Sequence, residues 1–368
     1  MTDFEKLFNP RAIGIIGVNE KRAGGYWVSI FKNSGFDKPI YLFNPRLKGQ
    51  TIADLPVYGS VLDIPESQLI DYVIVAVPAK LCPKILEECG KKGVSFATIF
   101  ASGFSEVGNH HLEVEVLEVV KKYGIRVIGP NCMGIFVPKN KITFSSLLTN
   151  ESGNFSGIFQ SGGLAIYISA KGQSIYGTFP SKMLSIGNQI DLNFVDFLEY
   201  FLEDDETNII ALYVENIKSQ EIGRKFINIV KKLTAKGKPV ILWKVGSGEA
   251  TRETIISHTG GLAGSLKIWE AVAKQTGALM VKDSNELINL AMTFQHISSM
   301  PINRKMGITT GGGGASIETA DIFERYDLLV PKLAPETAAK FREFVPDVNT
   351  IFRNPLDLGG SMGHPETF

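Results

Sequence analysis

His258 is the residue whose surroundings in this sequence best suit chemistry. It lies in the segment Ser257-His258-Thr259-Gly260-Gly261-Leu262-Ala263-Gly264, which follows an apolar, strand-like stretch at residues 238–245. A neutral imidazole nitrogen is a nucleophile near neutral pH, and main-chain N–H groups of small residues can surround an anion. The segment therefore suits a histidine that accepts a phosphoryl group. Taken alone, it fits an irregular connection with an exposed histidine better, so other residues must decide.

A carboxylate that could orient this histidine follows another apolar stretch, residues 209–214. Glu215 comes directly after that stretch, where an unpaired carboxylate would be costly. A carboxylate bonded to one imidazole nitrogen fixes the tautomer and leaves the other nitrogen free to attack. Because Glu215 and His258 follow consecutive strand-like stretches, we expect their loops to be neighbours. An exposed Glu215 is the alternative.

Glycine-rich helix starts supply candidate anion sites. Ser161, Gly162 and Gly163 stand between a strand-like stretch and a helix, where N–H groups and the helix dipole attract anions. A simple helix cap would explain the serine but not the glycine pair. The run of four glycines at 311–314 is a further candidate, with a flexible connection as its alternative.

The loops after the first strands suit a ligand that carries phosphates. The loop at 17–25 includes Gly17, Val18, Asn19, Gly24 and Gly25, but it lacks the GxGxxG pattern. After the second strand, where dinucleotide folds usually place an acid, stand Asn44, Pro45, Arg46 and Lys48. Two cations there suit the extra phosphate of coenzyme A or NADP; ordinary solvated surface is the alternative. The same edge should also hold the loop residues Val77, Pro78, Ala101, Ser102, Gly103 and Asn131.

Apolar strands alternate with amphipathic helices along the chain, which predicts an α/β fold with parallel sheets. The first series has strands at 12–18, 40–43, 71–77, 94–100 and 125–128, with helices at 26–33, 81–91 and 113–123; His110 and His111 are expected in a loop. Residues 136–154 read as an irregular crossover. The second series has strands at 156–160, 182–186, 209–214, 240–245 and 278–281, with helices at 163–175, 193–203, 219–235, 265–276 and 284–299. A third series opens at 306.

Composition limits the classes of function. The 368 residues are 44% hydrophobic and 21% charged, with a net charge of zero, which favours large cores and argues against nucleic acid or a membrane surface as the main partner. Three cysteines without CxxC spacing favour a reducing compartment, and Cys132 is expected to be a buried thiol. No spacing suggests a metal site. Without an apolar signal or membrane segment, a cytoplasmic protein is expected.

Four motifs, in order, give the sequence a family resemblance. They are Gly129-Pro130-Asn131-Cys132-Met133-Gly134, Gln160-Ser161-Gly162-Gly163, Tyr213-Val214-Glu215 and the segment around His258. Together they resemble the NDP-forming acyl-CoA synthetases, relatives of the succinyl-CoA synthetase α subunit, over nearly the whole chain. The resemblance implies a Rossmann-like CoA-binding domain at 1–135 and a flavodoxin-like domain at 150–300. It also implies the start of a third, incomplete α/β domain at 303–368, to which Gly311–Gly314 and Asn354-Pro355-Leu356-Asp357-Leu358 would belong.

The resemblance also implies a reaction. Acyl-CoA, ADP and phosphate would give a carboxylic acid, CoA and ATP through an acyl phosphate and a phosphohistidine at His258. Glu215 would orient the histidine, while Ser161, Gly162, Gly163, Gly260 and Gly261 would bind phosphate. The first-domain loops would bind CoA. ATP or ADP with Mg²⁺ would bind mainly to an ATP-grasp β subunit or fused domain, so a hetero-oligomer or dimer is expected.

Besides an acid–thiol ligase that works mainly in the activating direction, two interpretations stay open. One is a regulatory module that binds CoA or acyl-CoA without phosphoryl transfer; His258 and Glu215 argue for the enzyme instead. The other is an NADP-dependent dehydrogenase, against which the missing GxGxxG pattern and the Asn44-Pro45 turn count.

Overall fold

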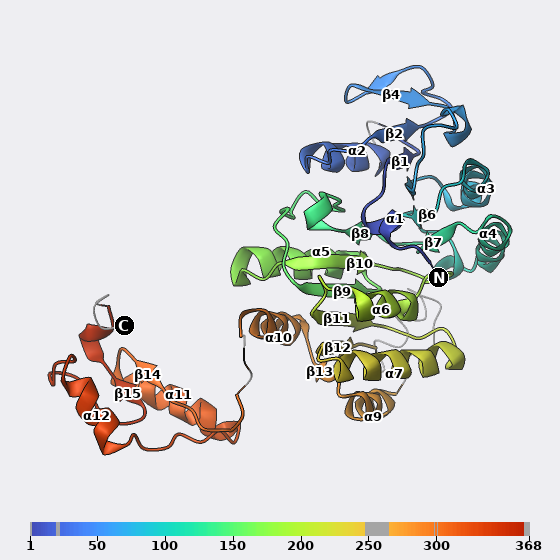
Figure 1. Cartoon of the computed structure of the whole chain (residues 1–368). Coiled ribbons are helices and arrows are strands. Elements are labelled where there is room, and N and C mark those ends of the chain that lie inside the picture. The colour runs from blue at the N-terminus through green and yellow to red at the C-terminus, as the bar shows by residue number, and fades with distance from the viewer. Residues whose placement is uncertain (1, 20–22, 247–264, 298, 300, 364–368) are drawn as a thin grey trace. The chain divides into compact units, whose positions relative to one another are not determined.

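The computed structural model describes residues 2–19, 23–246, 265–297, 299 and 301–363 of the chain (Figure 1). The chain divides into two compact units, Met1–His296 and Ile297–Phe368. The first unit contains two sheets, and the second contains a sheet of two strands. Among the described residues, no helix is both long and apolar enough to cross a lipid bilayer.

The first sheet has seven strands in the order β3-β4-β2-β1-β5-β6-β7. All neighbours are parallel except β3 and β4. Without β3, the order is the 3-2-1-4-5-6 order of dinucleotide-binding folds, so the predicted Rossmann-like class is confirmed. The strands are β1 Ile13–Ile16, β2 Ile40–Phe43, β3 Thr51–Ile52, β4 Leu55–Tyr58, β5 Tyr72–Val75, β6 Phe96–Ile99 and β7 Arg126–Ile128.

Helices cover both faces of this sheet, which explains its continuous apolar strands. They are α2 Ala23–Asn33, α3 Cys82–Lys92 and α4 His110–Tyr123. Figure 1 shows α3 and α4 side by side on one face and α2 on the other. All residues of β1, β5 and β6 are buried, as expected of parallel strands between two helical layers. Gly93 and Gly124 end α3 and α4 with φ of +83° and +73°, a conformation that glycine adopts without a Cβ penalty.

The second sheet has the strand order β13-β12-β11-β9-β10-β8. Its five parallel strands follow the 2-1-3-4-5 order of flavodoxin, and β8 adds an antiparallel edge. The predicted flavodoxin-like class is therefore confirmed. The strands are β8 Gly134–Phe136, β9 Phe155–Phe159, β10 Pro180–Ser185, β11 Ile209–Val214, β12 Val240–Lys244 and β13 Leu279–Val281.

Among the residues that the structure describes, five helices of the first unit flank this sheet, on both of its faces. They are α5 Gly162–Lys171, extended by a π-helix at Gly172–Tyr176, α6 Phe194–Glu203, α7 Gln220–Ala235, α9 Leu266–Thr276 and α10 Ser284–His296. The start of α6 is a capping box, in which the Asn193 side chain accepts from Val195 N at 2.9 Å and Asp196 accepts from Asn193 N at 3.0 Å. Ser219 caps α7 with a single hydrogen bond, in which its hydroxyl accepts from Ile222 N at 3.2 Å. These caps place the helix starts that the sequence predicted within one residue.

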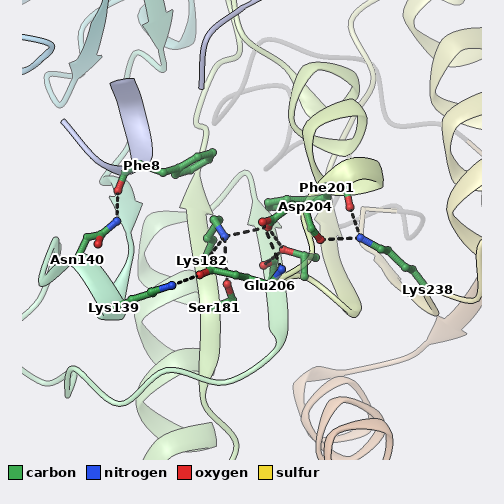
Figure 2. Close-up of polar contacts among 11 residues, drawn as sticks. Phe8, Lys139, Asn140, Ser181, Lys182, Phe201, Asp204, Glu206 and Lys238 are labelled. Atoms are coloured by element: carbon green, nitrogen blue, oxygen red, sulfur yellow. Dashed lines mark hydrogen bonds and ion pairs between the residues drawn. The ribbon is translucent and has the colours of Figure 1, made fainter. Parts of the chain in front are cut away.

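A buried cluster of charges lies at the amino-terminal edge of the second sheet (Figure 2). Lys182 of β10 has a side chain only 3% exposed, and its Nζ contacts Asp204 Oδ2 at 2.8 Å and Glu206 Oε2 at 2.9 Å. Both acids stand in the turn before β11. Lys139 also pairs with Glu206, and Lys238 donates to the carbonyl oxygens of Phe201 and Asp204. The ion pairs and hydrogen bonds among these residues offset the free-energy cost of removing their charges from water.

The N-terminal helix α1 (Glu5–Phe8) and its flanking residues fasten the first sheet to the second. The Phe4 ring centroid lies 5.8 Å from that of Phe96 in β6 and 5.4 Å from that of Phe197 in α6. At the start of β7, the Arg126 guanidinium pairs with Asp191 at 2.9 Å. These contacts join residues far apart in the sequence, which explains why residues 1–296 form one compact unit.

Two local expectations differ from the structure, and one hairpin was not predicted. His110 and His111 open α4 rather than lying in a loop. The crossover predicted at 136–154 overlaps β8, which reaches Phe136 as a three-residue edge strand. The hairpin of β3 and β4 was not predicted. Such short strands carry too few residues for a periodic pattern and depend on their partners.

The second unit is built around two short parallel strands, β14 Thr309–Thr310 and β15 Leu356–Asp357. Helix α11 Gly313–Arg325 begins inside the glycine run, and α12 Pro335–Arg342 follows it. Val345, Leu356 and Leu358 form its small buried core.

Candidate active site

A cavity of about 1,460 Å³ lies at the carboxyl ends of strands from both sheets of the first unit. Ligands of open α/β folds bind at that edge, and sites for small molecules usually measure about 300–1,000 Å³. The cavity is large enough for a ligand of coenzyme A size. Of the predicted site residues, it is lined by Gly17, Asn19, Asn44, Pro45, Arg46, Val77, Pro78, Ala101, Ser102, Asn131, Ser161, Gly162 and Gly163. The structure thus brings the first-domain loops and the glycine-rich helix start together.

Four other predicted residues, Val18, Gly24, Gly25 and Gly103, are not part of the lining. Val18 is fully buried. A Cβ on Gly24 would lie 2.4 Å from the Gly17 carbonyl oxygen, so this glycine permits a close approach of helix α2 to the first loop. Gly103 has φ of +109°, and its N–H donates to Glu106 at 2.5 Å. The contacts described for Val18, Gly24 and Gly103 are with other residues of the protein and not with the cavity.

Asn44 fixes the shape of the loops that line the cavity after β1 and β2. Its Nδ2 donates to the Val18 carbonyl oxygen at 2.7 Å, and its Oδ1 accepts from Arg46 N at 2.9 Å. Gly17 is required there because its φ is +91° and a Cβ would lie 2.5 Å from the Ala76 carbonyl oxygen.

Basic side chains line the same end of the cavity. They belong to Arg46, Lys48, Lys80 and Lys84. Lys48 Nζ pairs with Asp63 at 3.0 Å, which lowers the pKa of that carboxyl group. The excess of cations suits a ligand with several phosphates, as coenzyme A has.

The start of α5 forms the other end of the lining. Ser161 is its N-cap, and its hydroxyl accepts from Leu164 N at 3.3 Å. A Cβ on Gly162 would lie 2.6 Å from Met133 Cγ, whereas one on Gly163 would meet nothing within 4 Å. The glycines therefore keep this helix terminus open, with the positive end of its dipole at the cavity.

Glu215 is buried, with only 5% of its surface exposed, so the alternative of an exposed carboxylate was wrong. It is not in the cavity lining, but its main-chain N–H donates to Gln160 Oε1 at 2.6 Å, and Gln160 is in that lining. Burial, together with the neighbouring Glu215 carboxylate, raises the pKa of Tyr213. Lys244 Nζ donates to the Glu215 carbonyl oxygen at 2.9 Å.

His258, Gly260 and Gly261 lie outside the described residues, between the end of β12 at Lys244 and the start of α9 at Leu266. Strands β11 and β12 are parallel neighbours, with Val214 opposite Lys244. The stretches that lead to Glu215 and to the His258 segment are therefore adjacent. The expected proximity of the two loops themselves lies outside the described residues.

Three further polar residues lie at this edge, and sequence reasoning assigned no individual role to any of them: Gln160, Asn188 and Lys244. All are buried, at 5%, 1% and 6% exposure. Each stands at or just after the carboxyl end of an apolar strand, and that position was the available signal. Asn188 lines the cavity, and its Nδ2 donates to Glu106 Oε2 at 2.7 Å.

Comparison with known proteins matches two family models in succession. A CoA binding domain matches residues 11–138, and a succinyl-CoA ligase like flavodoxin domain matches residues 152–294. The alpha subunit of acetate–CoA ligase [ADP-forming] II from Pyrococcus furiosus is 36% identical over 360 residues, which are 96% of this chain and 75% of that subunit. The chain belongs to the ADP-forming acid–CoA ligases. It is an alpha-type ligase chain, and CoA and a nucleotide take part in its reaction.

Further relatives of this ligase include a longer protein and a solved structure. The acetate–CoA ligase [ADP-forming] of Methanocaldococcus jannaschii is 38% identical, and the match covers 95% of this chain but 48% of that protein. The dinucleotide forming acetyl-coenzyme A synthetase 1 of Ca. Korarchaeum cryptofilum, solved with phosphate and ADP, matches with a TM-score of 0.85 and 33% identity. That match covers 98% of this chain and 76% of the other. These relatives support the ligase and not the CoA-sensing module.

Proposed function

We propose that this ligase chain transfers a phosphoryl group through His258, with Glu215 as the carboxylate that orients the imidazole. The burial of Glu215 beside the end of β12, which leads into the His258 segment, carries the proposal. Burial of a carboxylate costs free energy, so buried carboxylates occur mainly where they pair with a charged or polar group or serve at a functional site. Phosphate would bind at Ser161, Gly162 and Gly163, with Gly260 and Gly261 beside the histidine.

The reaction divides into three balanced transfers. A phosphate oxygen attacks the thioester carbonyl, the C–S bond breaks, and an acyl phosphate and CoA form. A nitrogen of neutral His258 attacks phosphorus, and the carboxylic acid leaves as the carboxylate. A terminal ADP oxygen then takes the phosphoryl group, which gives ATP and restores the imidazole. In each step the protein's main contribution is to position the groups and neutralise their charge.

The cavity supports a CoA site on the first-sheet loops. Gly17, Asn19, Asn44, Arg46, Pro78 and Ser102 lie in its lining, and cations surround its first-domain end. The thioester end of the ligand would then face the start of α5. We assign residues 1–135 to CoA binding, 150–300 to phosphoryl transfer and 303–368 to a third α/β domain.

The nucleotide and Mg²⁺ would be held mainly by an ATP-grasp partner, either a β subunit or a fused domain. The names of two relatives as alpha subunits, and the longer single-chain relatives, support this arrangement and a hetero-oligomer. Acetate is the first acid to test, because most of the similar ligases are named for it. Relatives named for 4-hydroxybutyrate and trans-ferulate make those acids the next candidates.

Phosphorylation of the chain tests this proposal. The protein is incubated with labelled phosphate and each acyl-CoA in turn, with and without an ATP-grasp partner subunit. We expect acid-labile, base-stable label that His258→Ala abolishes. His296→Ala is the matched control, because His296 is exposed at the end of α10, and it should keep the label. Label that survives in His258→Ala would refute the role of this histidine.

A further inference from the structure

The carboxamide of Gln160 has a fixed orientation. Its Oε1 accepts two main-chain hydrogen bonds, from Glu215 N at 2.6 Å and from Asn216 N at 3.0 Å. Both partners are donors, so the oxygen and not the nitrogen must face them. Strand pairing brings these residues together. Phe159, the last residue of β9, lies opposite Tyr213 of β11, so Gln160, which follows β9, reaches the turn after β11.

The other end of this carboxamide is a buried donor without a partner. Among the described residues, none accepts a hydrogen bond from Gln160 Nε2, although the residue is only 5% exposed. A buried N–H group that stays unpaired destabilises the fold, so such groups are rare unless a ligand completes them. Gln160 lines the large cavity directly before Ser161, Gly162 and Gly163.

We propose that Gln160 Nε2 donates a hydrogen bond to a phosphoryl oxygen of the phosphate, or of the acyl phosphate, bound at the start of α5. The inference rests on the proposed function and adds a ligand-binding residue to it. The open N–H groups of a helix of ten residues, and a neutral donor next to them, together make a cradle for an anion. A carboxamide suits this place because a carboxylate there would repel the phosphate.

The same side chain connects the phosphate to Glu215. Its oxygen holds the main chain of Glu215 and Asn216, while its nitrogen holds the phosphate. Gln160 takes no proton in the reaction. It fixes the position of the bound phosphoryl oxygen relative to Glu215, the carboxylate that orients His258. Transfer of the phosphoryl group to the histidine requires that these groups be held in fixed positions.

Two substitutions separate the donor from the acceptor. Gln160→Glu keeps an oxygen for Glu215 N and Asn216 N but replaces the donor by a second oxygen. Gln160→Met has a similar length and lacks both polar groups. Gln173→Glu is the matched control, because Gln173 lies outside the cavity lining and contacts only Thr149 by hydrogen bonds among the described residues.

The readouts are equilibrium affinities for inorganic phosphate and for CoA, with thermal melting to verify folding. Loss of one hydrogen bond to a charged group should weaken phosphate binding by about tenfold or more in both Gln160 variants. CoA affinity and the Gln173→Glu control should stay within about twofold of the unaltered protein. If Gln160→Glu does not fold, Gln160→Met carries the test, since it adds no charge.

Two results would overturn the inference. One is phosphate binding by folded Gln160→Glu that equals that of the unaltered protein, which would leave Gln160 with only its acceptor role. The other is an unaltered protein that binds no phosphate. Because phosphate binding is measured without acyl-CoA, a chain that binds phosphate through Gln160 but never labels His258 would refute the proposed function alone.

Discussion

Lys244 Nζ lies 2.9 Å from the main-chain carbonyl oxygen of Glu215 and donates a hydrogen bond to it. Lys244 ends β12, and Glu215 directly follows the neighbouring parallel strand β11. Lys244 is only 6% exposed. Burial lowers the pKa of Lys244 to about 8, although the Glu215 carboxylate opposes the shift. A cation is thus held beside the candidate catalytic carboxylate at a cost in stability.

That cost predicts a pH dependence of unfolding. Between about pH 8 and the unfolded pKa of 10.5, the unfolded lysine keeps a proton that the folded lysine has lost. The unfolding free energy of the wild type should therefore rise with pH in this window, by about 3 kcal/mol in total from this group. Lys244→Met should lack that contribution. Urea unfolding of both proteins at pH 7.5 and pH 10 measures the difference, and parallel pH profiles would contradict the prediction.

The buried cluster around Lys182 predicts a large loss of stability when its cation is removed. Lys182→Met leaves Asp204, with a side chain 8% exposed, without the Nζ contact at 2.8 Å. Breaking a buried ion pair on one side costs about 3–5 kcal/mol. Lys139→Met is the control: that side chain is 63% exposed, so its loss should cost less than about 1 kcal/mol. Equal unfolding free energies for the two variants would refute this account.

The strands and the location of the site could be predicted because their signals are local. Residues 209–214 form β11 with the predicted ends, since six successive apolar residues identify a strand buried on both faces. Ligands of open α/β sheets bind at the carboxyl ends of the strands, which predicted that Asn44, Pro78 and Ser161 lie in one region. All three line the cavity.

The role of Gln160 could not be predicted, because it depends on contacts between residues distant in the sequence. Its partners are Glu215 and Asn216, more than fifty positions away, and the sheet register alone brings them together. Asn188, which lines the same cavity, is similar, since the donor orientation of its side chain is set by Glu106 from the first sheet's loops. No local sequence pattern indicates whether the oxygen or the nitrogen of a side-chain carboxamide is available to a ligand.

The three cysteines should be unreactive in the folded protein. All are buried, and burial raises the pKa of Cys82 and of Cys132 to about 12 and also raises that of Cys89. Almost no thiolate exists at pH 8, although Cys132 lines the cavity. We expect no reaction with a disulfide reagent over minutes at pH 8 and reaction of all three in guanidinium. Rapid reaction of Cys132 in the folded protein would make it a candidate nucleophile after all.

Glu215→Gln should slow phosphorylation of the chain by about a hundredfold or more, while its fold stays intact. Glutamine has the same shape, and the main-chain bond from residue 215 to Gln160 Oε1 does not depend on the side chain. The variant loses the charge that fixes the imidazole tautomer, and a carboxylate-to-amide change beside the catalytic histidine of serine proteases costs about 10⁴ in rate. The measurement is the rate of label incorporation from phosphate and acyl-CoA.

Glu221→Gln is the control for that measurement, because the Glu221 side chain is 77% exposed at the start of α7, and it should label at the unaltered rate. Phosphate affinity should be nearly unchanged in Glu215→Gln, since the proposed phosphate contacts come from Gln160 and the start of α5. A rate loss without an affinity loss would place Glu215 in the transfer step itself. Unaltered labelling by a folded Glu215→Gln would instead show that its buried carboxylate serves the packing around Tyr213 and Lys244, and not the histidine.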